Sequence, residues 1–318
     1  MRNGECGMRN ESRTFQHNSE FRIPNSEFVI SLVTIAEIIA KAAARLAAHK
    51  IENSRLDAEV LLGHAMSRDR AWLVAHYPDR ISDVETRHYE RLVERRAVRE
   101  PLQYITEKQE FWGIDFLVTP DVLIPRPETE LVVENALSRL RNVTEPTIID
   151  LCTGSGCVAV CLARELPKAR VLATDRSAEA LAVAKINALR QGVDQQIRFI
   201  EGDLFGPLNV AGLEGSVDVI TANPPYVRSS ELPGLQPEVR DFEPEMALVS
   251  GPAGTEIAER IIAESPGYLK SGGALIMEFG MGQTEALREM IERTAVYAAT
   301  SVLKDLAGIE RVIFAKKQ

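Results

Sequence analysis

The sequence predicts an α/β protein with a largely parallel sheet, preceded by a small helical domain. Three observations lead to this fold class. From residue 128 onward, short apolar runs alternate with segments of helical periodicity, as in sheets built with crossover helices. Loops containing glycine or polar residues follow these runs. Residues 29–102, by contrast, show helical periodicity alone.

Residues 1–28 precede any periodic pattern. They are rich in Asn, Ser, Glu and Arg, and the sequence Asn-Ser-Glu-Phe occurs at 18–21 and again at 25–28. The segment lacks the apolar stretch of a secretory signal, so export is not expected. We expect a disordered tail, which a start codon assigned too far upstream would explain.

A small helical domain is expected over residues 29–102. Apolar residues at helical spacing predict a first amphipathic helix over 34–50. Ser54 is expected to cap a second helix. Ser82 and Glu85 form the capping box of a third.

Residues 103–127 change to a pattern typical of a β-hairpin, which we expect to link the two domains. The following domain, residues 128–318, begins with a predicted helix over 130–141. The last two strand-like runs are split by a turn and indicate an antiparallel hairpin at the sheet edge. The seven predicted strands are residues 147–151, 170–174, 197–200, 217–222, 274–279, 295–303 and 311–315.

Composition excludes several classes of protein. With 45% hydrophobic and 26% charged residues, the chain of 318 residues is neither fibrous nor wholly disordered. Its 37 Lys and Arg against 46 Asp and Glu give a net charge of -9, which argues against stable nucleic-acid binding. No run reaches the roughly 18 apolar residues of a membrane span. We therefore expect no membrane association.

The positions of the cysteines and histidines restrict which disulfide, metal and nucleophilic sites the sequence can form. Three of the four cysteines fall within residues 152–161, which is no disulfide framework and suits a reducing cytoplasm. Their spacing is not that of a metal site, and no histidine lies beyond residue 88. We expect no metal, and no histidine-dependent nucleophile within the last two thirds of the chain.

Ligands of such sheets bind beyond the carboxyl ends of the strands, so the loops that follow residues 151, 174, 200 and 222 are the candidate site. The first reads Asp-Leu-Cys-Thr-Gly-Ser-Gly and runs into a helix. Its glycines allow a tight turn close to a ligand. A plain strand-to-helix turn is the alternative. The candidate contacts are Cys152, Thr153, Gly154, Ser155 and Gly156.

The second and third loops offer carboxylates for an adenosine cofactor. Asp175 can accept hydrogen bonds from both ribose hydroxyls, although it can equally cap a helix. Asp203 can accept from an adenine amino group, with Leu204 or Phe205 against the ring. A turn with core residues behind it is the alternative there. A dinucleotide also remains possible.

The fourth loop, Asn-Pro-Pro-Tyr at residues 223–226, indicates chemistry on a planar NH₂ group. Such a nitrogen attacks poorly because its lone pair is delocalised. The side-chain oxygen of Asn223 and the carbonyl of Pro224, fixed by the adjacent Pro225, can accept its two N–H groups and direct the lone pair. Tyr226 would lie against the planar group. A strand end with a surface tyrosine is the alternative.

These loops resemble those of class I S-adenosylmethionine-dependent methyltransferases that modify planar NH₂ groups. The sequences at residues 55–59, 99–105, 123–130 and 278–280 extend the similarity. From about residue 30 the chain is similar to the protein glutamine N5-methyltransferases of peptide chain release factors, the PrmC/HemK family. The resemblance implies a Rossmann-like domain with a seven-stranded sheet and an antiparallel edge hairpin. It also implies that the helical domain recognises the substrate.

The resemblance further implies methyl transfer from S-adenosylmethionine to the glutamine amide of a Gly-Gly-Gln loop, in support of translation termination. No metal is required. Cys152 stands where glycine is usual, and Leu204 where many members carry an aromatic residue. By this analogy the cofactor is bound by Cys152, Thr153, Gly154, Ser155, Gly156, Asp175, Asp203, Leu204 and Asn223, and the glutamine by Asn223, Pro224, Pro225 and Tyr226.

Alternatives remain within and outside this class. A glutamine of a ribosomal protein is an equally suitable substrate for these motifs. Adenine-N6 methyltransferases of DNA or RNA also hold a base with Asn-Pro-Pro-Tyr. A nucleotide-dependent oxidoreductase would account for the first two loops but not the fourth. A non-catalytic cofactor-binding regulator would have no use for the Asn-Pro-Pro-Tyr motif.

Overall fold

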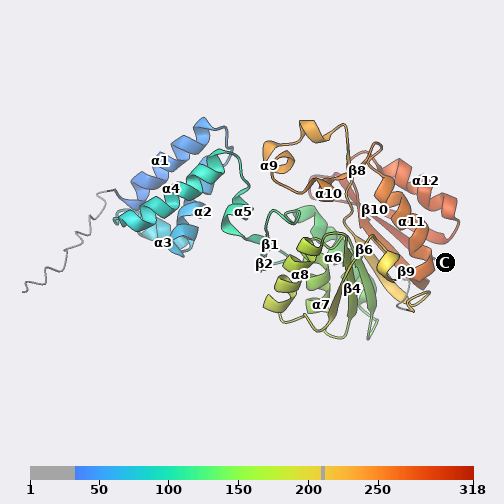
Figure 1. Cartoon of the computed structure of the whole chain (residues 1–318). Helices are drawn as coiled ribbons and strands as arrows, with labels where there is room; N and C mark the ends of the chain where they lie inside the picture. The colour runs from blue at the N-terminus through green and yellow to red at the C-terminus, as the bar shows by residue number, and fades with distance from the viewer. Residues whose placement is uncertain (1–32, 209–211) are drawn as a thin grey trace, which may run out of the picture.

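The computed structural model describes residues 33–208 and 212–318, and the tail predicted at 1–28 lies outside them. Figure 1 shows a helical part, coloured blue to teal, next to a larger α/β part, coloured green to red. A short hairpin and an extended segment connect the two. No helix within the described ranges is long and apolar enough to cross a membrane.

The helical part packs around its own apolar core, which includes Ile39, Leu61 and Tyr89. The capping box of Ser82 is confirmed. The prediction that Ser54 caps the second helix is wrong: Asn53 is the cap, since its carbonyl already accepts from the Asp57 amide at 2.9 Å. The helices are α1 (Ile35–Ala48), α2 (Ser54–Met66), α3 (Arg70–Ala75), α4 (Asp83–Ala97) and α5 (Leu102–Thr106). Neither α3 nor α5 was predicted, and α5 occupies the start of the segment 103–127 that was expected to be a hairpin.

A tight hairpin follows α5. Strands β1 (Gln109–Phe111) and β2 (Ile114–Phe116) pair antiparallel. Trp112 and Gly113, which join them, both have positive φ, as the twist of a two-residue hairpin turn requires. The chain then runs extended to the 3₁₀ helix η1 (Pro127–Thr129).

The α/β part contains a seven-stranded sheet in the order β10-β11-β9-β6-β3-β4-β5. Neighbours from β9 to β5 run parallel, and β11 lies antiparallel to both β9 and β10. This confirms the predicted fold class, with its antiparallel edge hairpin. The strands are β3 (Thr147–Leu151), β4 (Arg170–Asp175), β5 (Ile197–Glu201), β6 (Val217–Ala222), β9 (Leu269–Glu278), β10 (Tyr297–Lys304) and β11 (Glu310–Lys317).

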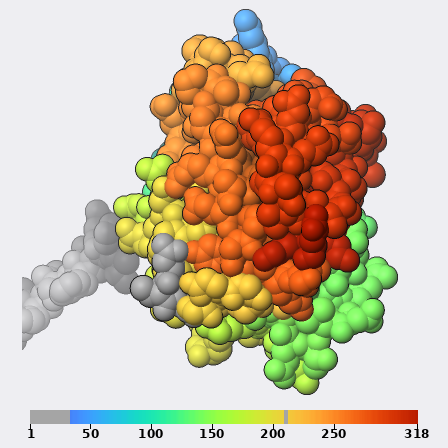
Figure 2. Space-filling view, turned by 90° about the vertical axis from the view of Figure 1, so that its right-hand side faces the viewer, coloured from blue at the N-terminus to red at the C-terminus, as the bar shows by residue number. Residues whose placement is uncertain are grey.

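Helices cover both faces of this sheet, and each face has its own apolar core. Alternate residues of the central strands enter opposite cores: Ile148 packs with one and Ile149 with the other. In Figure 2 the C-terminal elements, coloured orange to red, gather on one continuous face. The helices of the two layers are α6 (Glu130–Leu140), α7 (Cys157–Glu165) and α8 (Ala178–Arg190), then α11 (Glu256–Tyr268) and α12 (Thr284–Thr294).

Between β6 and α11 the chain forms an irregular excursion, residues 227–255. The excursion contains β7 (Val227–Arg228), η3 (Leu232–Gly234), α9 (Pro237–Arg240), α10 (Glu245–Leu248) and β8 (Val249–Gly251). Its strand β8 packs against α11, and its two short strands pair parallel with each other.

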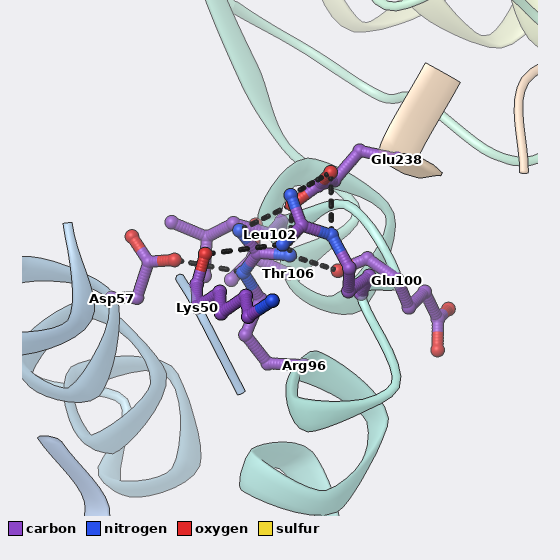
Figure 3. A network of polar contacts seen from close by, with 8 residues as sticks. Lys50, Asp57, Arg96, Glu100, Leu102, Thr106 and Glu238 are labelled. Carbon is purple, nitrogen blue, oxygen red and sulfur yellow. Dashed lines mark hydrogen bonds and ion pairs between the residues drawn. The ribbon is translucent and has the colours of Figure 1, made fainter. Parts of the chain in front are cut away.

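An ion-pair cluster joins this excursion to the helical part (Figure 3). Glu238 of α9 accepts hydrogen bonds from the guanidinium groups of Arg96 and Arg99, at distances of 2.6 to 3.2 Å. Arg96 also donates to Asp57 at 2.7 Å and to the carbonyl of Glu100. Arg96 is almost fully buried, so these carboxylates must offset the cost of removing its charge from water.

Candidate active site

A cavity of about 470 Å³ opens at the carboxyl ends of the parallel strands. The loops after β3, β4, β5 and β6 form its floor. Residues 121–125 and 244–250 complete its wall, so both the extended segment and the excursion contribute. All four predicted loops meet here. Lining residues from them include Cys152, Thr153, Gly154, Ser155, Asp175, Asp203, Leu204, Asn223 and Pro225.

Asp150, near the end of β3, anchors the first loop through hydrogen bonds. Its carboxylate accepts hydrogen bonds from Thr153 Oγ1 at 2.6 Å and from Thr221 Oγ1 at 2.7 Å, which ties the loop to β6. Complete burial raises the pKa of Asp150 to about 6, although these hydroxyls oppose the shift. The side chain of Asn187 also donates to the Ser155 carbonyl. The loop is therefore fixed before any ligand binds.

Positive φ angles shape this loop. Gly154 and Gly156 have φ of 53° and 79°, and Cys152, which stands where glycine is usual in the resembling family, has φ of 56°. A Cβ on Gly156 would lie 3.0 Å from that of Ala184, so glycine is also needed for close packing of α7 on α8. The Cys152 side chain lines the cavity. Burial raises the pKa of its thiol, which keeps it protonated.

Asp175 ends β4 and faces the first loop. Its Oδ2 accepts from the Gly154 amide at 2.8 Å and its Oδ1 from the Ser177 amide at 3.0 Å. Each oxygen therefore keeps lone pairs for further donors such as ribose hydroxyls. Burial raises the pKa of this carboxyl, whereas the two amides lower it. The cap of α8 is Ser177 and not Asp175, so the alternative role of Asp175 as helix cap is wrong.

In the third loop the two hydrophobic candidates, Leu204 and Phe205, lie in different surroundings. Leu204, with φ of 49°, lines the cavity. Phe205 is fully buried and its ring stacks on Tyr268 at 4.7 Å, so it belongs to the core. Asp203 lines the cavity but also forms an exposed ion pair with Arg260 at 2.8 Å.

The Asn-Pro-Pro-Tyr segment follows β6. Asn223 and Pro225 line the cavity, whereas Pro224 and Tyr226 are not among the described residues that do. The Nδ2 of Asn223 donates to Thr129 at 3.1 Å. Its Oδ1 is buried and has no hydrogen-bond partner within residues 33–208 and 212–318. The hydroxyl of Tyr226 lies 3.4 Å from Glu278.

Two buried residues next to this segment, Thr129, which also lines the cavity, and Glu278, were not among the predicted site residues. Thr129 donates to Glu278 Oε2 at 2.6 Å, and both side chains are at most 2% exposed. Burial raises the pKa of Glu278 to about 7; Glu128 raises it further, while Thr129, Tyr226 and Arg311 lower it. Both residues fall within sequences that carry the family resemblance, but their pairing across 149 positions has no local signal.

The cavity suits an adenosine-type cofactor with an amide substrate. Besides Asn223 Oδ1, the buried hydroxyl of Ser155 lacks a partner among the described residues, and both residues line the cavity. Such atoms are costly unless a ligand satisfies them. The described ranges contain no cluster of His, Cys, Asp or Glu that could hold a metal. The strand order and the loops around this cavity define a class I methyltransferase.

Comparison with known proteins gives the family. Residues 37–106 match the PrmC N-terminal domain and residues 129–234 the methyltransferase small domain. A release factor glutamine methyltransferase from Moorella thermoacetica is 41% identical over 286 residues, which is 90% of this chain and 99% of that protein. One from Nitratidesulfovibrio vulgaris is 43% identical over 289 residues, 90% and 96% of the two chains. The chain belongs to the release factor glutamine methyltransferase family.

A solved structure supports the fold independently. The hMettl16 catalytic domain, crystallised with the MAT2A 3′UTR hairpin 6, superposes with a TM-score of 0.53 at 17% identity. The match covers 78% of this chain and 92% of that one.

Proposed function

We propose that the protein transfers a methyl group from S-adenosylmethionine to the side-chain amide nitrogen of the glutamine in a release factor's Gly-Gly-Gln motif. The relatives compared above are named release factor glutamine methyltransferases, which supports the methylation of a release factor glutamine. A cytoplasmic location follows from this substrate, because translation termination takes place there.

The observation that carries the proposal is Asn223, which lines the cavity and whose buried Oδ1 has no hydrogen-bond partner among the described residues. A glutamine amide carries two N–H donors, and an acceptor with no other partner is what one of them requires. The sequence-based expectation that the Pro224 carbonyl receives the other N–H remains part of the proposal. So does the placement of Tyr226 against the amide plane.

The cofactor would lie along the first two loops. Asp175 would accept from its ribose, Gly154 and Ser155 would line its methionine part, and Leu204 would pack near adenine. The bound cofactor supplies an electrophilic methyl group on a sulfonium. Asp203, because it also pairs with Arg260, would contribute from the cavity rim.

Catalysis in this arrangement depends on alignment. Asn223 holds an N–H of the glutamine and thereby favours a nitrogen whose lone pair is directed at the methyl carbon. The nitrogen would gain the methyl group and release one proton to solvent, which leaves neutral N5-methylglutamine. Because the glutamine nitrogen would attack the methyl carbon directly, with the electron pair of the broken bond left on the departing sulfur, no covalent enzyme intermediate is needed.

The test is incubation with labelled S-adenosylmethionine and three substrates: an unmodified release factor, the same factor with its Gly-Gly-Gln glutamine replaced, and duplex DNA. Label on the first alone is the expected result. Equal labelling of both factors, or labelling of DNA, would refute the proposed substrate. A ribosomal protein included as a fourth substrate would test the alternative that the enzyme methylates a glutamine of a ribosomal protein.

A further inference from the structure

The amide of Asn223 is connected to a buried carboxylate through one hydroxyl. Thr129 Oγ1 accepts from Asn223 Nδ2 at 3.1 Å and donates to Glu278 Oε2 at 2.6 Å. Thr129 stands at the end of η1, Asn223 after β6, and Glu278 at the end of the neighbouring strand β9. Three separate segments therefore converge behind the Asn-Pro-Pro-Tyr motif.

While Glu278 is ionised, the chain of hydrogen bonds has only one direction. An ionised carboxylate can only accept, so the single proton of the Thr129 hydroxyl is directed to Glu278. The oxygen of Thr129 then has only lone pairs left for Asn223. Asn223 must present its NH₂ group to Thr129, and its carbonyl oxygen is the atom that remains for the cavity.

This direction matters because an asparagine side chain is nearly symmetric in shape. If the amide of Asn223 turned by 180°, its NH₂ group would face the NH₂ group of a glutamine substrate. Two donors would then meet and no hydrogen bond could form. Shape alone does not prevent that turn, so the orientation must come from the hydrogen-bond partners.

We propose that Thr129 and Glu278 are positioning residues that fix the amide of Asn223 with its oxygen toward the substrate. This inference rests on the proposed function, since it concerns how the glutamine amide is held. Tyr226 reaches the other oxygen of Glu278, so one carboxylate is linked to both ends of the Asn-Pro-Pro-Tyr motif, directly to Tyr226 and through Thr129 to Asn223. Because Glu278 belongs to the sheet, the orientation is set by the most rigid part of the fold.

The test compares Thr129→Val, which keeps the shape and removes the hydroxyl, with Thr129→Ser, which restores the hydroxyl. The matched control is Thr284→Val. Thr284 donates to Glu310 at the same 2.6 Å distance, but this pair lies away from the cavity. For each variant, kcat and KM for the release factor and Kd for S-adenosylmethionine are measured.

We expect Thr129→Val to lower kcat by roughly 10- to 100-fold, the effect of losing one buried hydrogen-bond partner. KM and Kd should change less than about threefold, because the hydroxyl only orients another residue. Thr129→Ser and Thr284→Val should stay near wild type. A Thr129→Val enzyme with wild-type kcat would overturn the inference.

A second measurement does not depend on the substrate. In protein labelled with ¹⁵N-asparagine, the side-chain NH₂ signal of Asn223 is identified by its absence in Asn223→Asp. Its protons should exchange slowly in wild type and in Thr284→Val, and clearly faster in Thr129→Val. Unchanged exchange in Thr129→Val would refute the orientation. If wild type labels no release factor, the proposed function fails, while this signal still decides the inference.

Discussion

Replacement of Gly156 by alanine tests whether the first loop needs glycine for packing as well as for its backbone angle. Gly156 has φ of 79°, and a Cβ at this position would lie 3.0 Å from Ala184 Cβ and 3.2 Å from Ala184 Cα. Ala184 belongs to α8 and is fully buried, so it has no flexible atoms that could move aside. Accommodating the methyl group would require α7 and α8 to separate.

The expected cost has two parts. A left-handed backbone costs a non-glycine residue about 1–2 kcal/mol, and overpacking a buried contact costs about 1–3 kcal/mol. Gly192→Ala isolates the first part, because Gly192 has a similar φ of 69° and no described atom within 4 Å of the added Cβ. We therefore expect Gly156→Ala to lower the free energy of unfolding by about 2–5 kcal/mol, and Gly192→Ala by about 1–2 kcal/mol.

Chemical denaturation followed by circular dichroism measures both variants, and titration with S-adenosylmethionine measures their affinity. Separation of α7 from α8 would also move residues 152–156, so Gly156→Ala should bind the cofactor at least about tenfold more weakly. Gly192→Ala should bind it normally. Equal stability of the two variants would show that the contact with Ala184 is unimportant and would refute the packing argument.

Three further predictions concern the site and its attachment to the helical part. Asn223→Ala should lower kcat by about 10²–10³-fold, as for loss of a transition-state hydrogen-bond group, with Kd for S-adenosylmethionine nearly unchanged; near wild-type turnover would contradict its role. The value of kcat should fall as the pH drops below about 7, because protonation of Glu278 frees the Thr129 hydroxyl from donating to it, and a pH profile of Thr129→Val should lack this limb. Glu238→Gln removes one charge beside buried Arg96, so hydrogen exchange in α4 should indicate a loss of about 1–3 kcal/mol in local stability, without change in cofactor affinity. Unaltered hydrogen exchange in α4 would show that the ion pairs of Glu238 do not stabilise this helix.

The sheet could be predicted because its central strands are short, nearly continuous apolar runs that end in polar loops. β3 and β6 have the predicted bounds, since both are buried on both faces and stop where the loop chemistry starts. β9 begins at Leu269, five residues earlier than predicted, because its first part contains polar and glycine residues that carry no strand pattern. The six-residue helix α3 is too short for its periodicity to be distinguished.

The site was predictable to the extent that it follows strand ends. Every loop expected to meet at the cavity does so, because carboxyl ends of parallel strands share one edge of the sheet. The residue pattern alone left Leu204 and Phe205 as alternatives for the contact with adenine. In the structure Leu204, which has a positive φ, lines the cavity, and Phe205 lies in the core. The residue pattern also could not reveal the link from Thr129 to Glu278, because only the fold brings these distant residues together.

The buried carboxyls show where the protein gives up stability for function. Burial alone would raise the pKa of Glu59 and of Glu238, but hydrogen bonds from arginines outweigh it and lower both. Asp150, Asp175 and Glu278 lie around the cavity, and for each of them burial prevails and the pKa is raised. A raised carboxyl pKa means that the ionised form is less favourable in the folded protein than in the unfolded chain.

The sign of this linkage gives a pH window. Between the ordinary carboxyl pKa and the raised values of about 6 for Asp150 and about 7 for Glu278, the folded state binds more protons than the unfolded state. These two groups therefore reduce stability as the pH rises through that range. Ionised Asp150 anchors the first loop, and ionised Glu278 sets the direction of the bonds that reach Asn223. The same charges that weaken the fold near neutral pH thus prepare the site for a cationic cofactor and an NH₂ substrate.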